Sequence, residues 1–315
     1  MIEKHGLARE HPGRFASLII VGILLLIILG LYLSSVFILR DMASRRVEKF
    51  ATTPEGLGLE DETITATSAD GIPLKAWYLA TNSPQGLLVI LHGMDGMDAS
   101  SLLPQAKFLY NAGYASIVLD MRAHGRSGGD HIGFAFEEPQ DVCSLLDWIV
   151  SQTDLKDVPL VLLGFSMGGA TAIRTAAIRP DVDAVISVSS YSSMDRMLGQ
   201  GMTLMGAPPE LVTIYTPFLR LGLETLYGVN PTEASPEHDI PAISPRPVLL
   251  IHGTADSQVP LEQAYIIKKA GGENVELWIA EGADHLVFQG DGTGLEDADY
   301  RQTILDFLDR ALAGK

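Results

Sequence analysis

The distribution of apolar residues divides the chain into a short uncharged segment and a long patterned one. Residues 15–39, FASLIIVGILLLIILGLYLSSVFIL, contain no charged side chain and are bracketed by Arg14 and Arg40. A helix of about 25 residues is roughly 37 Å long, which exceeds the ~30 Å hydrocarbon core of a bilayer. A buried core helix of this length would still need a polar face for water, and this segment has none. The segment therefore predicts a transmembrane helix that contacts the lipid bilayer through residues 15–39.

The flanks of the apolar segment favour a retained anchor over a cleaved signal peptide. A signal peptide has a shorter apolar region that ends in a small-residue cleavage site, and no such site follows residue 39. Three basic residues precede the segment and four follow it, a difference too small for the positive-inside rule to assign a side of the membrane. We expect a single-pass membrane protein with an N-terminal tail at residues 1–14 and the rest of the chain in an unassigned compartment.

Beyond the anchor, short apolar runs alternate with amphipathic stretches. Residues 40–60 mix charges, Pro54 and glycines, which is typical of a linker. Two alternating runs joined through Asp70 and Gly71 predict a hairpin, and six near-continuous apolar runs are typical of parallel strands covered on both faces. The predicted strands lie at residues 63–69, 73–80, 86–93, 114–120, 158–166, 183–190, 246–253 and 274–280. With helical stretches between them, residues 61–315 predict one α/β domain with an eight-stranded, mostly parallel sheet.

Residues 190–240 interrupt this alternation with two predicted helices between the sixth and seventh strands. Insertions at the carboxyl edge of a parallel sheet lie over its ligand crevice, so the segment predicts a small helical lid. The lid contains Met194, Met197, Met202 and Met205. Flexible methionine side chains can line an acyl-chain pocket, and they can equally well pack the two helices onto the domain.

The fifth predicted strand ends in GFSMG, residues 164–168, directly before a helical stretch. A G-x-S-x-G sequence at a strand-to-helix junction is typical of a nucleophile elbow, in which a sharp turn exposes the serine hydroxyl and the glycines relieve backbone clashes. Ser166 is therefore the candidate nucleophile. The N–H of Met167 begins the next helix, where positive partial charge gathers, and is a candidate oxyanion donor. The N–H of Met94, in LHGMDG after the third strand, is the second candidate donor.

A serine hydroxyl needs a general base to remove its proton and an acid to orient that base. His285 in GADH is the candidate base, because it follows the last strand in the order Ser, Asp, His expected for this topology. Asp256 in HGTAD, after the seventh strand, is the candidate acid. Asp195, after the sixth strand, is a competitor. Asp284 adjoins His285 in the sequence, and adjacent residues rarely face each other.

The remaining histidines and the single cysteine give no indication of a metal site. His92 and His252 end strands and are expected to brace loops. No histidine or cysteine spacing matches a zinc motif, so neither a metal nor another cofactor is expected. Cys143 is the only cysteine, which excludes an intramolecular disulfide.

Composition and charge exclude some classes of partner. Of the 315 residues, 47% are hydrophobic and 19% are charged, which fits a well-packed domain joined to an apolar anchor. After residue 50 the chain has 35 acidic and 15 basic side chains. A surface this acidic argues against binding nucleic acid and against lying flat on anionic lipid. The expected partners are a small acyl substrate and the bilayer, and the sequence gives no prediction of the oligomeric state.

Together these motifs resemble the α/β-hydrolase superfamily over residues 60–313. LHGMDG, DMRAHGRSGG, GFSMGG, IHGTADSQVP and GADH occur in the order found in serine hydrolases of the monoglyceride lipase and serine aminopeptidase type. The N-terminal span is similar to that of the membrane-anchored Bem46 group. The resemblance implies a triad of Ser166, Asp256 and His285, with the amides of Met94 and Met167 as the oxyanion hole.

Two residues distinguish this chain from other proteins of similar fold. Ala123, in DMRAHGRS, occupies a position that is often glycine in these relatives, which bears on the conformation of that loop and not on the triad. Ser166 disfavours the epoxide hydrolases and dehalogenases of similar fold, because those enzymes carry aspartate at the elbow.

Three functions are consistent with these residues. The preferred one is a membrane-anchored serine esterase, lipase or thioesterase that forms an acyl-enzyme and hydrolyses it with water. The second is a peptidase or acyltransferase with the same triad. An aminopeptidase would need acidic lid residues such as Glu210, Glu224 or Glu233 to face the substrate amine. The third is a membrane-tethered binding module that keeps the fold without the chemistry, which an intact triad disfavours.

Overall fold

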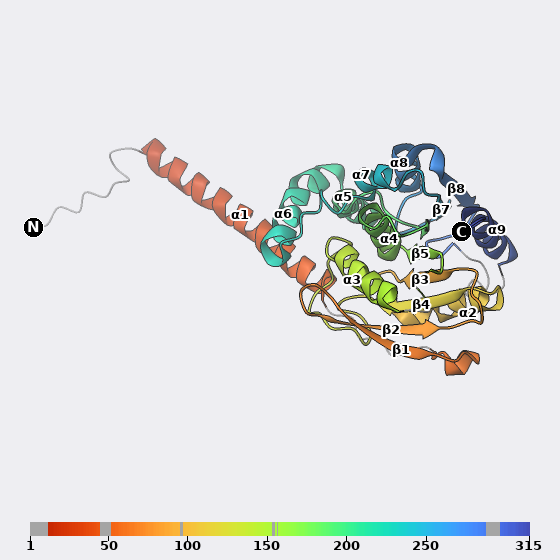
Figure 1. The fold of residues 1–315 in the computed structure, drawn as a ribbon. Helices are drawn as coiled ribbons and strands as arrows, with labels where there is room; N and C mark the ends of the chain where they lie inside the picture. The colour runs from red at the N-terminus through yellow and green to blue at the C-terminus, as the bar shows by residue number, and fades with distance from the viewer. Residues whose placement is uncertain (1–11, 45–51, 95–96, 153–154, 156, 288–296) are drawn as a thin grey trace, which may run out of the picture.

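The computed structural model describes residues 12–44, 52–94, 97–152, 155, 157–287 and 297–315. Residues 1–11 of the expected tail and residues 45–51 of the expected linker lie outside the described residues. Figure 1 shows a long N-terminal helix that projects away from an α/β domain.

An eight-stranded sheet forms the centre of the domain. Its strands are β1 (Glu62–Thr67), β2 (Pro73–Leu79), β3 (Leu87–Leu91), β4 (Ala115–Asp120), β5 (Leu160–Phe165), β6 (Ala184–Val188), β7 (Val248–Gly253) and β8 (Val275–Ala280). Their order across the sheet is β1-β2-β4-β3-β5-β6-β7-β8. β2 runs antiparallel to both of its neighbours, and the other neighbouring strands are parallel. The prediction of an eight-stranded, mostly parallel α/β sheet that begins with a hairpin is confirmed.

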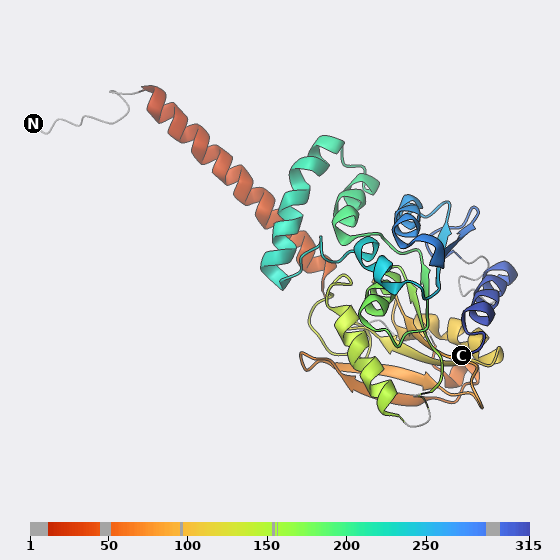
Figure 2. The same ribbon diagram turned by 45° about the horizontal axis from the view of Figure 1, so that its top comes forward.

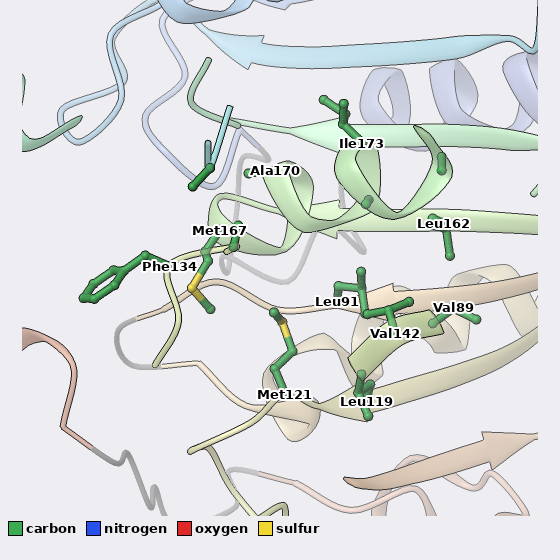
Figure 3. Close-up of a cluster of buried hydrophobic side chains, with 14 of the residues drawn as sticks. Val89, Leu91, Leu119, Met121, Phe134, Val142, Leu162, Met167, Ala170 and Ile173 are labelled. Atoms are coloured by element: carbon green, nitrogen blue, oxygen red, sulfur yellow. The ribbon is translucent and has the colours of Figure 1, made fainter. Parts of the chain in front are cut away.

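Helices cover both faces of the sheet and create two apolar layers. The helices α3 (Glu138–Ser151), α4 (Met167–Ile178) and α8 (Glu262–Gly271) contribute to one layer, and α2 (Leu103–Asn111) and α9 (Ala298–Ala311) to the other. Successive residues of a strand point to opposite faces, so Leu91 packs in the first layer and Ile90 in the second. Figure 3 shows part of the first layer, where side chains of β3, β4 and β5 meet Val142 of α3 and Ile173 of α4. The shorter helices are η1 (Glu55–Leu57), η2 (Ala99–Leu102), α7 (Pro236–Asp239), η3 (Ile240–Ile243) and η4 (Gly272–Asn274).

The N-terminal helix α1 (Pro12–Met42) has two parts that differ in exposure. Every side chain from Phe15 to Gly30 is exposed, and Leu39 near the other end is fully buried. By length and composition the helix could cross a membrane over residues 14–42. An isolated helix that exposes so many apolar side chains to water would be unfavourable, which is consistent with a lipid environment for the first part.

The second part of α1 packs against an insertion between β6 and β7. This insertion contains α5 (Met194–Leu204) and α6 (Pro209–Tyr227), at the place where the sequence predicts a lid. α6 lies beside α1 in both orientations of the molecule (Figure 1 and Figure 2). Gly222 makes this approach possible, because a Cβ at that position would lie 2.6 Å from Cδ1 of Leu39. Hydrogen bonds join Tyr32 to Thr225, Ser34 to Tyr215, and Ser35 to the carbonyl of Phe218.

One loop of the domain holds the ends of both helices. The N–H of Ile132 donates to the carbonyl of Ala43, just after α1, at 2.9 Å. The ring of His131 stacks on Tyr227, the last residue of α6, with 4.7 Å between the ring centres. The C-terminal end of α1 is therefore a fixed part of the domain and not a flexible connection to it.

Candidate active site

Ser166 lies in the turn between β5 and α4. Its φ of 53° and ψ of −116° lie outside the regions that residues other than glycine usually adopt, so the turn is strained. The N–H of Ser166 donates to the carbonyl of Val188 in β6 at 2.8 Å, which fixes the turn against the sheet. This geometry is the one that the G-x-S-x-G sequence predicts for an elbow.

The glycines on either side of Ser166 are required by the closeness of the backbone. A Cβ on Gly164 would lie 2.1 Å from the carbonyl oxygen of Gly168, and a Cβ on Gly168 would lie 2.2 Å from the carbonyl oxygen of Leu91. Both contacts are to backbone atoms, which cannot rotate away as a side chain could. The sequence pattern therefore reflects a helix that begins directly on top of the sheet.

His285 and Asp256 meet at the carboxyl edge of β7 and β8. The Nδ1 atom of His285 lies 3.0 Å from Oδ1 and 2.9 Å from Oδ2 of Asp256. With Nδ1–H donating to the carboxylate, Nε2 is the ring nitrogen that can accept a proton. His285 and Ser166 line the same cavity. Residues separated by more than a hundred positions thus converge at one edge of the sheet.

The surroundings of Asp256 stabilise its charged form. Its side chain is fully buried, and its carboxylate accepts hydrogen bonds from the N–H groups of Gln258 and Val259 at 2.9 and 2.8 Å. Nε2 of His252 lies 3.2 Å from Oδ2. Burial opposes the charge, but the hydrogen bonds from His252 and His285 outweigh it and hold the pKa of Asp256 well below its ordinary value.

The two other aspartates considered from the sequence have different positions. Asp284 accepts hydrogen bonds at 2.8 Å from the N–H and the hydroxyl of Ser257 and from the N–H of His285. It thereby ties the loop that carries Asp256 to the loop that carries His285. Asp195 instead forms an ion pair with Arg220 of α6, with one N–O distance of 2.8 Å. The structure brings Asp256, and not Asp195, to the imidazole.

The loop after β3 lies against Ser166. A Cβ on Gly93 would lie 3.3 Å from Cβ of Ser166, so the next residue, Met94, is at the same edge of the sheet. Nε2 of the buried His124 lies 2.8 Å from the carbonyl oxygen of Met94 and fixes the orientation of that stretch of backbone. Met94 and Met167 both line the cavity that contains Ser166. The side chain of Met167 projects from the start of α4 toward Phe134 (Figure 3).

Ala123 adopts the conformation that glycine has at such a position. Its φ is 58°, in the left-handed region that favours glycine. Asp120, whose side chain is buried, accepts a hydrogen bond from Nε of Arg126 at 2.7 Å and closes the loop around Ala123. The departure from the family pattern therefore leaves a glycine-like loop in place.

A cavity of about 440 Å³ opens above Ser166. Its size falls in the range of sites for small molecules. Eight of the ten methionines line it: Met42, Met94, Met97, Met167, Met194, Met197, Met202 and Met205. Its polar side chains are Ser166, Tyr191, Tyr215, Gln258 and His285. Among the described residues that line it, none is Asp, Glu, Lys or Arg.

Sequence reasoning missed several residues of this site. Ile38 and Met42 of α1 line the cavity, although the sequence assigns residues 15–39 to an anchor and residues 40–60 to a linker. His124 and Asp284 position loops of the site, a role that the sequence analysis gives to neither residue, although it names Asp284 as a neighbour of His285. A turn residue with a hydrogen-bonding side chain leaves no pattern in the sequence beyond its identity, so no signal could have singled these residues out.

Comparisons with known proteins show what the chain as a whole is similar to. The family model Hydrolase_4, described as serine aminopeptidase S33, matches residues 82–213. The uncharacterized protein YqkD of Bacillus subtilis is 26% identical over 257 residues, which is 80% of each chain. Human monoglyceride lipase is 27% identical over 267 residues, covering 75% of this chain and 86% of the lipase.

A solved structure provides a comparison of the fold. The esterase Pf2001 of Pyrococcus furiosus superposes with a TM-score of 0.69 at 23% identity, covering 85% of this chain and 98% of the esterase. The strand order, the family match and these relatives agree, and the chain is an α/β-hydrolase.

Proposed function

We propose that this α/β-hydrolase is a membrane-anchored enzyme that cleaves esters of apolar acyl groups. In this proposal Ser166 is the nucleophile, His285 the general base and Asp256 the acid that orients it. The observation that carries the proposal is one apolar cavity that contains Ser166 and His285, with Asp256 2.9 Å behind the imidazole. The chain is a serine ester hydrolase, the class to which its family match and its monoglyceride lipase relatives point.

The reaction begins with proton transfer from Ser166 to Nε2 of His285 as Oγ attacks the ester carbonyl. The charged Asp256 stabilises the imidazolium that forms and keeps Nδ1 protonated. His285 then gives the proton to the leaving alcohol, which departs and leaves an acyl-enzyme on Ser166. A water molecule, deprotonated by His285 in turn, hydrolyses that ester and releases the carboxylic acid and free Ser166.

The negative charge that develops on the carbonyl oxygen needs two donors. The N–H groups of Met94 and Met167 fill this role in our proposal, because both residues line the cavity beside Ser166. Met167 is also the first residue of α4, so the partial positive charge of the helix N-terminus acts on the same oxygen. A donor of this kind contributes about 3 kcal/mol of transition-state stabilisation.

The lining of the cavity favours an uncharged acyl group over an aminoacyl group. A free substrate amine needs an acidic partner when it leaves water, because an unpaired buried charge is costly. The lid glutamates proposed for that role, Glu210, Glu224 and Glu233, are exposed and are not among the residues that line the cavity. Thioether and aliphatic side chains instead match a hydrocarbon chain.

The membrane anchor is the second part of the proposal. The exposed, uncharged stretch from Phe15 to Gly30 supports it, because lipid is the environment in which such a surface is stable. In this arrangement the catalytic domain stays at the surface of the bilayer that contains its substrates.

A fluorophosphonate probe, which reacts with activated serines, tests the catalytic assignment on the full-length protein in detergent. We expect labelling of the wild type and of Ser151→Ala, an exposed serine on α3, and no labelling of Ser166→Ala. Hydrolysis of p-nitrophenyl esters should be lost in the same variant by a factor of about 10⁴ or more. Labelling of Ser166→Ala at the wild-type rate would contradict the proposal.

The substrate class is tested with matched ester and amide substrates. We expect cleavage of p-nitrophenyl butyrate and laurate, and no cleavage of aminoacyl p-nitroanilides. Faster cleavage of the anilides would favour the peptidase. Transfer of the acyl group to added glycerol in preference to water would favour the acyltransferase.

A further inference from the structure

One wall of the cavity above Ser166 includes the end of α1, the helix that projects from the α/β domain. Ile38 and Met42 of α1 line it, four positions apart and therefore on the same face of the helix. Tyr215 and Leu219 of α6, also four positions apart, line it next to them. The helix that the sequence marks as an anchor thus reaches the space in which the substrate must lie.

We propose that α1 determines which acyl groups the enzyme accepts, with Ile38 and Met42 forming the membrane-side wall of the acyl pocket. The inference rests on the proposed function, because it takes the cavity above Ser166 to be the acyl site. It adds a role for the apolar helix beyond tethering: the anchor and the specificity element are one continuous helix.

The wall is held firmly enough to discriminate between substrates. Leu39, between the two lining residues, is fully buried and contacts Gly222 of α6. One turn earlier, the hydroxyl of Ser35 donates to the carbonyl of Phe218 at 3.0 Å. Ser34 bonds to the hydroxyl of Tyr215, itself a residue of the cavity, at 2.8 Å. Ile38 and Met42 therefore occupy defined positions relative to the lid.

The length of α1 places this wall at the surface of the bilayer. A helix crosses the ~30 Å hydrocarbon core in about 20 residues. Counted from Arg14, that length ends close to Ser34, where α1 bonds to α6. Ile38 lies one turn further and is 40% exposed, and Met205 of the lid, which also lines the cavity, is 80% exposed. These exposed apolar residues mark the open side of the cavity as the side that faces the lipid.

Substitutions in the full-length protein test the wall by changing the volume of the pocket. Ile38→Trp and Met42→Trp narrow it, so we expect the ratio of kcat/KM for p-nitrophenyl laurate to that for the butyrate to fall about tenfold. Ile38→Ala widens it and should move the ratio in the opposite direction, a change that a folding defect would not produce. Phe37→Trp is the matched control, because Phe37 is adjacent in sequence, 77% exposed and outside the cavity lining.

Labelling of Ser166 by the fluorophosphonate probe reports whether each variant keeps its active site. If the wild type requires Ser166 for hydrolysis but the ratio stays within twofold in all three wall variants, the inference is wrong and the proposed function stands. If Ser166→Ala hydrolyses both esters as fast as the wild type, the proposed function is wrong and the inference falls with it.

Discussion

Two walls of the same cavity are built in opposite ways. The wall that contains Ser166 and His285 is the edge of the sheet, where backbone atoms approach each other so closely that Gly164 and Gly168 have no room for a Cβ. The opposite wall consists of α1, α5 and α6, and its side chains at the cavity are methionine, leucine and isoleucine together with Tyr215. The main chain sets the shape of one wall, and side chains carried by packed helices set the shape of the other.

This difference corresponds to what each wall has to do. A nucleophile, its base and the oxyanion donors must keep one geometry, because a displacement of about 1 Å can cost a hundredfold in rate. An acyl chain needs only an apolar surface of suitable volume, and unbranched thioether side chains adapt to it. Substitutions in the first wall should therefore abolish catalysis or folding, and substitutions in the second should change selectivity.

The largest effect should come from Asp256→Asn. The amide has no negative charge with which to stabilise the imidazolium, and its NH2 group can donate to Nδ1 of His285, which favours the tautomer that has its proton on Nε2 and cannot act as the base. We expect kcat for p-nitrophenyl butyrate to fall by about 10³ to 10⁴, the size of effect known for this kind of change in a serine protease triad. Steady-state kinetics with the full-length protein provide the measurement.

Two other aspartates serve as controls for that loss. Asp284→Asn keeps an oxygen that can still accept from Ser257, so we expect a loss of about tenfold or less. Asp195→Asn affects only the ion pair with Arg220 on the lid, and activity should stay within about twofold. A larger loss in Asp195→Asn than in Asp256→Asn would reverse the assignment of the acid.

The next effect is on stability, and it compares the substitution of one glycine in each wall by alanine. Gly168→Ala puts a methyl group 2.2 Å from the carbonyl oxygen of Leu91, and the backbone must move to accept it. We expect a loss of about 3 kcal/mol or more in the free energy of unfolding. Gly199→Ala in α5 meets no atom closer than 3.6 Å and should stabilise its helix by up to about 1 kcal/mol. Denaturant unfolding of both variants measures whether an added methyl group lowers the free energy of unfolding only in the first wall.

The wall fixed by main chain is also the one that the sequence describes best. The spacing of Gly164, Ser166 and Gly168 predicts the elbow because only glycine fits where a helix starts directly on a strand. The order of the parallel strands brings the ends of β7 and β8 together, so Asp256 and His285 could be paired from the order of elements alone. Backbone constraints leave traces in the sequence because they restrict which residues are possible.

The second wall leaves no such trace. Ile38 and Met42 lie in or beside an uninterrupted apolar run, and an apolar residue that faces lipid is indistinguishable in sequence from one that faces a cavity. Ser34 and Ser35 are the exception, because both make hydrogen bonds to α6. Two polar residues near the end of the run, after Gly30, were the available sign that this part of the helix packs against the domain.

Gly222 tests how the wall made of α1, α5 and α6 is positioned. Valine at this site would meet Leu39, so α1 would have to shift away from α6 at a cost of about 1–3 kcal/mol. We expect a change in the laurate-to-butyrate ratio, with fluorophosphonate labelling of Ser166 within twofold of the wild type. Glu224→Val is the matched control, since it introduces the same β-branched residue on an exposed face of α6. An unchanged ratio in Gly222→Val, with lowered stability, would show that the wall tolerates movement of α1.

The smallest effect lies at the loop that holds the ends of α1 and α6. The hydrogen bond to Glu137, together with that to Asp130, outweighs burial and raises the pKa of His131 to about 9. Protonation therefore favours the folded state, and this contribution is complete below the unfolded pKa of about 6.5 and is lost as the pH rises through about 9. His131→Gln should lower the free energy of unfolding by about 1 kcal/mol near pH 6, because solvent screens the partly exposed pair, and the difference should vanish near pH 10. Groups that titrate in both the wild type and His131→Gln contribute equally to their free energies of unfolding and cancel in the difference between them. Thermal unfolding of the two proteins at pH 6 and pH 10 therefore measures the contribution of His131. A difference that is equal at both would mean that the stacking of its ring on Tyr227, rather than its charge, holds the end of α6.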